Sequence, residues 1–220
     1  MKKGRFFSAI AGLLVATCAM AADFVSDQFT TPAGKVLTIT FVRHGSLAMS
    51  YDGKQIQVDP VSDYADYNAF PKADLILVTH AHGDHLDLKA IEALRKEGTV
   101  VVANPASAEK IERPAAQVMR NGDKKTWEGI QIEAVPAYNT TEGRDKFHPK
   151  HRDNGYVLDF DGLRVYVAGD TEDIPELAAL KAIDVAFLPV NQPYTMTPEQ
   201  AAELVTGNTL YFGAVMLKAG

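Results

Sequence analysis

The feature that most constrains this chain is a histidine cluster that directly follows a buried strand. The run "DLILVTH" (74–80) is the predicted strand, and "THAHGDHLD" (79–87) then holds three of the chain's six histidines and two aspartates. His80 and His82 are two residues apart at the end of extended backbone, so their side chains leave on the same face. Gly83 permits a sharp turn that brings Asp84 and His85 to the start of a helix. The spacing therefore predicts two adjacent pairs of metal ligands.

The chemistry of these side chains favours a transition metal over a plain polar turn. Imidazole and carboxylate together suit zinc, iron or manganese, and a helix N-terminus beside the turn favours the negative charge of Asp84. The alternative is that Asp84 or Asp87 only caps the helix. Several histidines placed directly after a buried apolar strand serve no packing purpose, which favours metal binding.

The rest of the chain alternates strands and helices. Strands are predicted at 36–43, at 46–60 as two short strands around the Asp52-Gly53 turn, and at 99–103, 116–120, 130–138, 155–170 and 183–190. Helices are predicted at 86–98, 105–112, 175–182 and 197–206. This order predicts sheets in the middle with helices packed outside, in one domain. The longest stretch without clear structure is Asn139 to Asn154, and such long loops are often functional.

The N-terminus has the plan of a secretory signal peptide over residues 1–21. Basic residues precede an apolar run from Phe6 to about Val15, and small residues follow it. A membrane helix is the alternative, but the run is shorter than the roughly 20 apolar residues that a span needs. Lipidation of Cys18 is less favoured than cleavage before Ala22, which would remove this single cysteine. We therefore expect a mature domain at 22–220 in the periplasm or secreted.

The charge of the chain limits its partners. The formal net charge is −6, and no basic stripe is available to release counterions from phosphates. Nucleic acid is thus not expected as a partner, and neither is a membrane after signal cleavage. The expected partner is a small-molecule substrate, and the oligomeric state is left open.

The motif formed by His80, His82, Asp84 and His85 resembles the HxHxDH signature of the metallo-β-lactamase superfamily. The segment "FVRHGSLAMSYDGKQIQVDP" resembles the opening hairpins of its branch of small metal-dependent hydrolases. Similar likenesses, in the same order, are carried by "PAYNT", "FHPK", "VYVAGDTEDIPEL" and "LPVNQPYTMTPEQAAE". The resemblance implies an α/β fold, a four-layer αββα sandwich of two mixed sheets flanked by helices. Metals would bind at one edge between the sheets.

The resemblance also implies a ligand set. His80 and His82 would bind one metal, Asp84 and His85 the second, and Asp170 would bridge them. Asp170 has a physical case of its own, because it ends an apolar strand after a glycine, although a turn or cap role is the alternative. The third histidine of the first metal is His148, with His151 as the alternative. An equivalent of His44 lies near the site in related proteins, but a structural role for His44 is equally open.

One departure from the family pattern concerns the end of the chain. Related sequences carry a final histidine after the last helix, whereas this sequence reads "NTLYFGAVMLKAG" and has no histidine after His151. Either water or another residue takes its place, or the chain is C-terminally incomplete. One tightly bound metal with a weaker second site is therefore expected.

These residues predict an exported hydrolase in which a metal-bound hydroxide attacks an ester, lactone, amide or phosphodiester. One or two divalent ions are expected, with zinc favoured over manganese and iron. Asp84 would orient the water and pass a proton, and Tyr194 and Asn139 are candidate donors to an oxyanion. β-Lactamase activity is disfavoured because a cysteine ligand is absent at Gly169-Asp170-Thr171. The alternatives are a metal-binding protein of the same fold without turnover, and a di-iron redox site that needs a flavin partner.

Overall fold

The computed structural model describes residues 24–113, 115–206 and 211–212. The expected signal peptide, Cys18 and most of the segment after the last helix lie outside these described residues. None of the helices within the described ranges combines the length and the apolar character that a membrane-spanning helix requires.

The first sheet has seven strands in the order of the sequence. Its strands β1 to β4 pair antiparallel as hairpins, and β4 to β7 then pair parallel. The strands are β1 (Ser26–Thr30), β2 (Val36–Arg43), β3 (Ser46–Tyr51), β4 (Lys54–Val58), β5 (Leu75–Val78), β6 (Val100–Ala103) and β7 (Gln117–Val118).

The second sheet has six strands in the order β13-β12-β11-β10-β9-β8. It repeats the plan of the first sheet, because β8 to β11 pair antiparallel and β11 to β13 pair parallel. The strands are β8 (Lys124–Trp127), β9 (Ile130–Ala137), β10 (Asp153–Phe160), β11 (Leu163–Val167), β12 (Val185–Phe187) and β13 (Tyr211–Phe212). Both sheets are therefore mixed.

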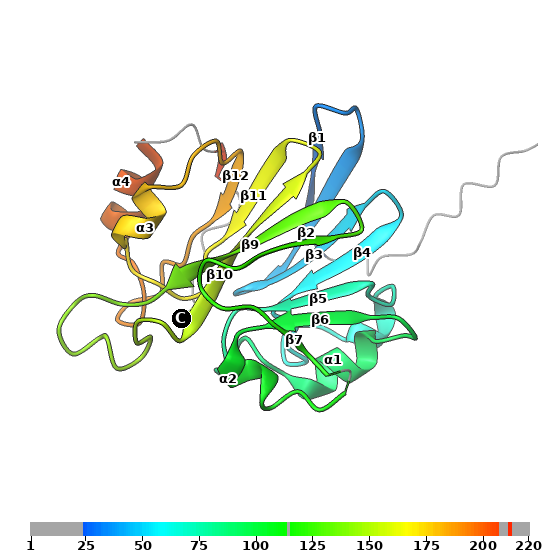
Figure 1. The fold of residues 1–220 in the computed structure, drawn as a ribbon, viewed down its shortest axis with the longest axis horizontal. Helices are drawn as coiled ribbons and strands as arrows, with labels where there is room; N and C mark the ends of the chain where they lie inside the picture. Colours follow the sequence, from blue (N-terminus) through cyan, green and yellow to red (C-terminus); the bar gives the residue numbers. More distant parts are fainter. Residues whose placement is uncertain (1–23, 114, 207–210, 213–220) are drawn as a thin grey trace, which may run out of the picture.

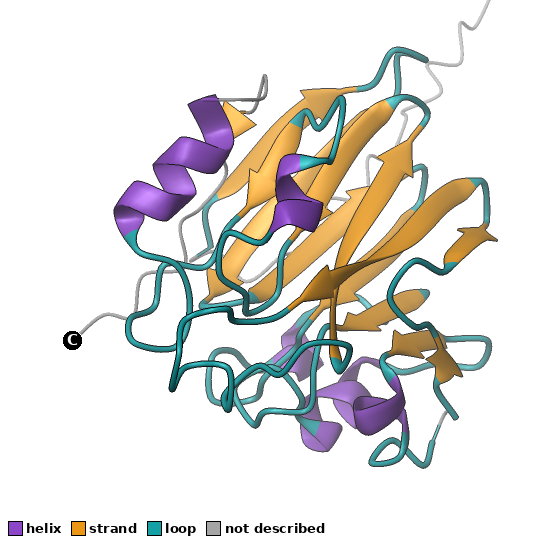
Figure 2. Cartoon of the chain, turned by 60° about the vertical axis from the view of Figure 1, so that its left-hand side comes forward, coloured by secondary structure: helices purple, strands orange, loops and turns teal. Residues whose placement is uncertain are grey.

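Helices cover the outer face of each sheet, as Figures 1 and 2 show. The helices are α1 (Leu88–Leu94), α2 (Pro105–Ala108), α3 (Pro175–Ala178) and α4 (Pro198–Thr206), with a short 3-10 helix η1 (Tyr67–Ala69). Buried side chains form a central core between the sheets. Two outer cores lie where α1 and α2 pack on the first sheet and α3 and α4 on the second. The expected αββα sandwich is confirmed.

The predicted elements differ from the observed ones mainly at sheet edges and in helix length. The sequence reading missed the edge strands β1, β8 and β13. The side chains of β1 and β8 are mostly exposed or half-buried, so their apolar alternation is weak. The predicted helices at 105–112 and 175–182 shorten to the single turns α2 and α3. The other predicted strands and helices are present, and the predicted long loop runs from the end of β9 to the start of β10 (light green in Figure 1).

The two sheets meet closely at the edge where β5 and β11 end. The hydroxyl of Tyr156 on β10 donates to the carbonyl of Val78 at 2.9 Å, and the backbone N–H of Asn154 donates to the carbonyl of Thr79 at 3.1 Å. Gly155 lies between these two residues, and a Cβ atom there would come within 2.7 Å of the carbonyl oxygen of Ala168. The absence of a side chain at Gly155 thus lets the segment after β11 lie close against β10, next to the contact between β10 and the end of β5.

We expect Gly155→Ala to lower the free energy of unfolding by about 1–3 kcal/mol, because backbone atoms would have to move apart. Urea unfolding of the metal-free protein, followed by circular dichroism, measures this loss. Gly83→Ala is the matched control, since its Cβ would meet open space and the expected change is within about 1 kcal/mol. Equal stability of the two variants would contradict this account of the sheet contact.

Candidate metal centre

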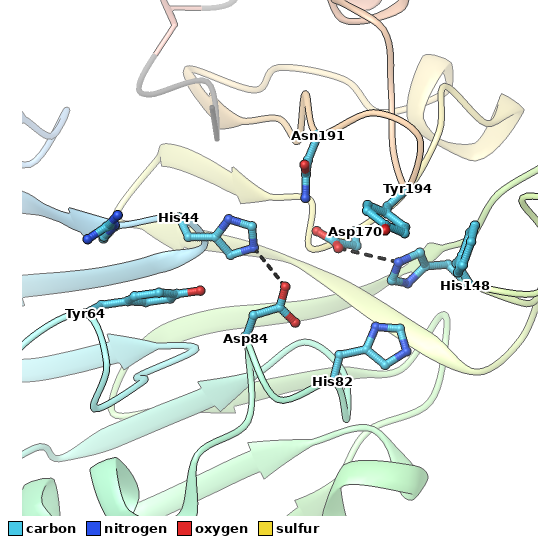
Figure 3. A pocket seen from close by; sticks show the side chains of 10 residues that line it. His44, Tyr64, His82, Asp84, His148, Asp170, Asn191 and Tyr194 are labelled. Atoms are coloured by element: carbon cyan, nitrogen blue, oxygen red, sulfur yellow. Dashed lines mark ion pairs between the residues drawn. The ribbon is translucent and has the colours of Figure 1, made fainter. Parts of the chain in front are cut away.

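The fold brings the predicted ligands together from distant segments of the chain (Figure 3). His80 and His82 follow β5, and His148 lies in the long loop before β10. Each offers a ring nitrogen, and the three nitrogens lie within 4.8 Å of one another. The ring centroid of His148 is 5.0 Å from that of His80 and 4.8 Å from that of His82. The structure therefore forms a three-histidine group from two separate segments.

Asp170, which follows β11, lies between this group and a second one. Its Oδ2 atom is 3.4 Å from Nε2 of His148, and its Oδ1 atom is 3.4 Å from Nε2 of His85. Together with His80, Asp170 and His85 form another set of ligand atoms within 4.8 Å. One carboxylate thus faces both halves of the cluster.

The second half also includes His44, for which the sequence left a structural role open. His44, Asp84 and His85 offer ligand atoms within 4.8 Å of one another. Nε2 of His44 lies 3.4 Å from Oδ2 of Asp84, and the rings of His44 and His85 meet edge to face at 5.0 Å.

Several atoms of the cluster fit a bound cation because they are buried without a hydrogen-bond partner. These atoms are Nε2 of His44, His80 and His85 and Oδ1 of Asp170. Buried polar atoms are normally paired, so this group of unpaired atoms needs an explanation. Imidazole nitrogen and carboxylate oxygen form the donor set that divalent transition metals prefer. The residues present therefore fit such an ion.

A buried carboxylate, Asp59, fixes the orientation of two of these imidazoles. Its Oδ1 atom accepts from the backbone N–H of Thr79 at 2.8 Å, and its Oδ2 atom accepts from the Thr79 hydroxyl at 2.6 Å. Nδ1 of His85 is 2.8 Å from Oδ2, and Nδ1 of His80 is 3.0 Å from the Thr79 hydroxyl. The Thr79 hydroxyl donates its proton to Asp59, so it can only accept a hydrogen bond from His80. The Asp59 carboxylate likewise accepts from His85. Both imidazoles therefore donate from Nδ1. Their Nε2 atoms then face the site.

Asp153 orients His148 in the same way. Its Oδ2 atom lies 3.2 Å from Nδ1 of His148, and Arg152 donates to both of its oxygens. The side-chain amide of Asn104 donates to the carbonyl of Arg152 at 2.7 Å. His148 therefore also presents Nε2 to the cluster.

The electrostatics of the three-histidine group favour uncharged imidazoles. Burial lowers the pKa of His80 well below its ordinary value, and the neighbouring imidazoles of His85 and His148 lower it further. Burial and His148 also lower the pKa of His82. Both rings are therefore neutral at neutral pH, which is the state that binds a metal.

The carboxylates favour positive charge in the second half of the cluster. Burial opposes protonation of His85, but Asp170 and Asp59 outweigh it and raise the pKa of His85 well above its ordinary value. Burial of Asp170 is likewise outweighed by His85 and His148, so its pKa is lowered. The imidazole of His44, whose Nε2 atom lies 3.4 Å from Oδ2 of Asp84, lowers the pKa of Asp84. Both aspartates are ionised at neutral pH.

An open cavity of about 450 Å³ leads to the cluster. In Figure 3, His44 and Tyr64 lie on one side of it and His148 and Tyr194 on the other, with Asp170 between them. The cavity is lined by Arg43, His44, Tyr64, His82, Asp84, Phe147, His148, Asp170, Asn191 and Tyr194.

The structure corrects the role expected for Asn139. This side chain is buried, and its amide nitrogen donates to the backbone carbonyls of Arg144 at 3.2 Å and Tyr194 at 2.7 Å. Both amide hydrogens are thus used, and Asn139 has none to donate to an oxyanion. Its observed contacts hold the Tyr194 loop, whereas Tyr194 itself lines the cavity, as does Asn191, which the sequence did not indicate.

His151, the alternative to His148, lies elsewhere. It is exposed and lines a separate depression with Arg120 and Arg152. It belongs to none of the ligand groups found among the described residues.

Sequence reasoning also missed Asp59 and Asp153. A signal existed for Asp59, because "VDP" places an aspartate directly after a strand, as Asp170 is placed soon after β11, although β4 (KQIQV) is less apolar than β11 (LRVYV). No comparable signal marks Asp153, which lies at the end of the long loop.

The buried carboxylate of Glu172 attaches the long loop to the Asp170 segment. Its Oε2 atom accepts from the backbone N–H groups of Thr140 and Thr141, both at 2.8 Å, and Arg144 donates to its Oε1 atom at 3.2 Å. The Glu172 side chain is 0 % exposed. The start of the loop that carries His148 is thereby fixed beside Asp170.

The protein has two mixed sheets with helices outside, and a cluster of histidines and aspartates lies at their common edge. This arrangement defines the class of protein as the metallo-β-lactamase fold. Residues 38–207 match the family model described as the Beta-lactamase superfamily domain, and the chain belongs to this family.

Named relatives agree with this assignment. A metal-dependent hydrolase of Thermococcus kodakarensis is 35% identical over 181 residues, which cover 77% of this chain and 79% of that protein. A crystal structure of a Parabacteroides distasonis protein assigned to the metal-dependent hydrolases is 61% identical, with a TM-score of 0.83 and coverage of 86% and 87%. Igni18, a metallo hydrolase of Ignicoccus hospitalis, is 26% identical, with a TM-score of 0.65 and coverage of 80% and 81%. The expected enzyme class, a metal-dependent hydrolase, is confirmed.

We expect Asp59→Asn to weaken metal binding about 10- to 100-fold, because the variant removes the carboxylate that orients His80 and His85. Competition with a chromophoric chelator measures this affinity. Asp66→Asn is the control, since Asp66 is exposed and only caps η1. Unchanged affinity in folded Asp59→Asn protein would rule out the orienting role.

We expect Glu172→Gln to loosen the start of the long loop, since the amide replaces one oxygen that accepts a hydrogen bond and removes the charge facing Arg144. Amide hydrogen exchange at Thr140 and Thr141 should become about tenfold faster or more. The exposed Glu142 lies in the same loop, and Glu142→Gln should leave these rates unchanged. Equal rates in both variants would show that Glu172 does not hold the loop.

Proposed function

We propose that the protein hydrolyses an ester, lactone, amide or phosphodiester bond of a small molecule with water activated by one or two divalent metal ions. One observation carries the proposal: buried atoms of His80, His85 and Asp170 that have no hydrogen-bond partner gather beneath the floor of an open cavity, which Asp170 lines.

The ligand groups suggest how the ions are held. His80, His82 and His148 would hold the first ion, and Asp84 and His85 the second. Asp170 would be shared between them. His44 would supply a further nitrogen to the second ion. Zinc suits this mixed donor set, with manganese and iron as alternatives.

A bound divalent ion lowers the pKa of water from 15.7 toward about 7, so that hydroxide is available at neutral pH. The protein side chains would supply the remaining functions. Asp84 has a side chain that is 49% exposed, lines the cavity and is ionised, so it can orient the attacking water, accept its proton and pass it to the leaving group. The Tyr194 hydroxyl and the Asn191 amide can donate to the developing oxyanion.

The cavity lining supports water as the nucleophile. The residues that line it include no serine, threonine, cysteine or lysine, which are the usual side-chain nucleophiles. A covalent intermediate on the protein is therefore not part of this proposal.

The proposal includes export to the periplasm or outside the cell, on the basis of the leader pattern in residues 1–21. The negative net charge supports a small-molecule substrate over nucleic acid.

Metal analysis and hydrolysis assays test the proposal together. We expect purified protein to hold at least one divalent transition metal per chain by plasma mass spectrometry. It should hydrolyse a member of a panel of aryl esters, lactones, amides and phosphodiesters. Chelation should abolish turnover and added metal should restore it.

The double variant His82→Ala, Asp84→Ala should lose the metal and reduce turnover at least 100-fold, whereas His151→Ala should retain both, because His151 lies outside the cluster. Full metal occupancy without hydrolysis across the panel would instead favour the alternative, a metal-binding protein without turnover.

A further inference from the structure

We propose that the substrate carries a carboxylate on one side of the hydrolysed bond and a planar apolar group on the other. This inference deepens the proposed hydrolysis and rests on it. It is drawn from the two walls of the cavity, which the metal ligands separate.

The first wall carries a cation without an acidic partner. Arg43 lines the cavity, and within the described residues its guanidinium makes no ion pair or hydrogen bond, only a contact with the ring of Tyr64 at 5.9 Å. By contrast, Arg144 and Arg152 each pair with a carboxylate. A guanidinium held on an aromatic ring still presents its N–H groups to a ligand.

Two backbone irregularities place Arg43 in the cavity. Consecutive residues of a strand point to opposite faces, yet Arg43 and the following His44 both line the same cavity. The register of β2 against β3 shifts between Phe41 and Arg43, and His44 has a φ of 53°. His44 is the first residue of the two-residue turn between β2 and β3, where a positive φ is common, and the turn and the shifted register together set the direction of both side chains. The cation and the candidate metal ligand His44 are thus directed to the site together.

Arg43 is not paired with an acidic group of the cavity. Asp84 also lines the cavity, but within the described residues its ion-pair contact is with Nε2 of His44 at 3.4 Å, and it makes none with Arg43. Arg43 is the one arginine or lysine among the residues that line the cavity. A single positive charge suits a monoanionic carboxylate better than a phosphate dianion, and a guanidinium binds a carboxylate with two parallel hydrogen bonds.

The opposite wall is aromatic. Phe147 and Tyr194 meet edge to face, with ring centroids 4.8 Å apart, and Tyr194 is 38% exposed. Figure 3 shows Tyr194 and His148 across the cavity from Tyr64 and His44. A flat apolar group would contact the rings of this wall while the carboxylate reaches Arg43. The cavity volume of about 450 Å³ is in the range of small-molecule sites.

A matched pair of substrates tests the carboxylate. 4-Nitrophenyl hemisuccinate has a free carboxylate, and 4-nitrophenyl methyl succinate has the same skeleton without it. We expect kcat/KM of the metal-loaded protein to be about tenfold or more higher for the hemisuccinate, because a charge-assisted hydrogen bond is gained. Arg43→Gln should bring this ratio close to one, and Arg43→Lys should retain part of it.

Arg95→Gln is the charge-matched control. Arg95 is exposed on the far end of α1, so this variant should keep the wild-type ratio, which separates direct recognition from the general effect of one lost charge. Phe147→Ala should raise KM about three- to tenfold for both aryl esters while the carboxylate preference remains. Unchanged KM in Phe147→Ala would overturn the apolar half of the inference.

Binding without turnover separates this inference from the proposed function. Calorimetry with succinic acid monoanilide and its methyl ester should give about tenfold tighter binding of the free acid, and Arg43→Gln should remove the difference. Binding of this kind without hydrolysis of any panel substrate would reject the proposed function and leave the carboxylate site standing. If the wild type hydrolyses the two nitrophenyl esters with nearly equal kcat/KM, and also binds the free acid and the methyl ester equally, the carboxylate site is overturned. The proposed function would then still stand.

Discussion

The hydrogen bonds of the Asp59 carboxylate hold the cluster in place. Asp59 directly follows β4, and through Thr79 it reaches the end of β5, where the histidine motif begins. A buried carboxylate is costly unless it is fully hydrogen-bonded. Here the backbone and hydroxyl of Thr79 and the ring of His85 offset that cost, and the same contacts set the tautomers of His80 and His85. Stability and ligand orientation therefore depend on one group.

The second sheet completes the site because its strand ends reach the same edge. The backbone N–H of Asn154 bonds to the carbonyl of Thr79, and next to it Gly155 admits the carbonyl of Ala168. Asp170 follows two residues later, so it arrives beside His85 and His148. Glu172 then secures the start of the loop that carries His148. Close contact between two backbones, rather than any single ligand, brings the two halves of the cluster within reach of one ion.

How much of this could be read from the sequence depends on whether the signal is local. The strands with clear apolar alternation, the motif from His80 to His85 and the strand-end Asp170 are local patterns, and the structure brings these residues together with His148. The role of Asn139 could not be read, because its partners Arg144 and Tyr194 are defined only by folding. Edge strands such as β1 bury too little to leave a periodic signal.

Charge is divided within the cavity in a way that links metal binding to substrate choice. The floor combines ionised Asp84 and Asp170 with the uncharged imidazoles of His80 and His82, a set that attracts cations. A cation beside this floor would ordinarily pair with Asp84 and weaken its hold on a metal. Arg43 lines the same cavity, but within the described residues it makes no ion pair with Asp84, so this carboxylate stays available to an ion. The irregular backbone at residues 43 and 44 thus directs two side chains to the site, with His44 available to the ion and the Arg43 guanidinium available to an anion.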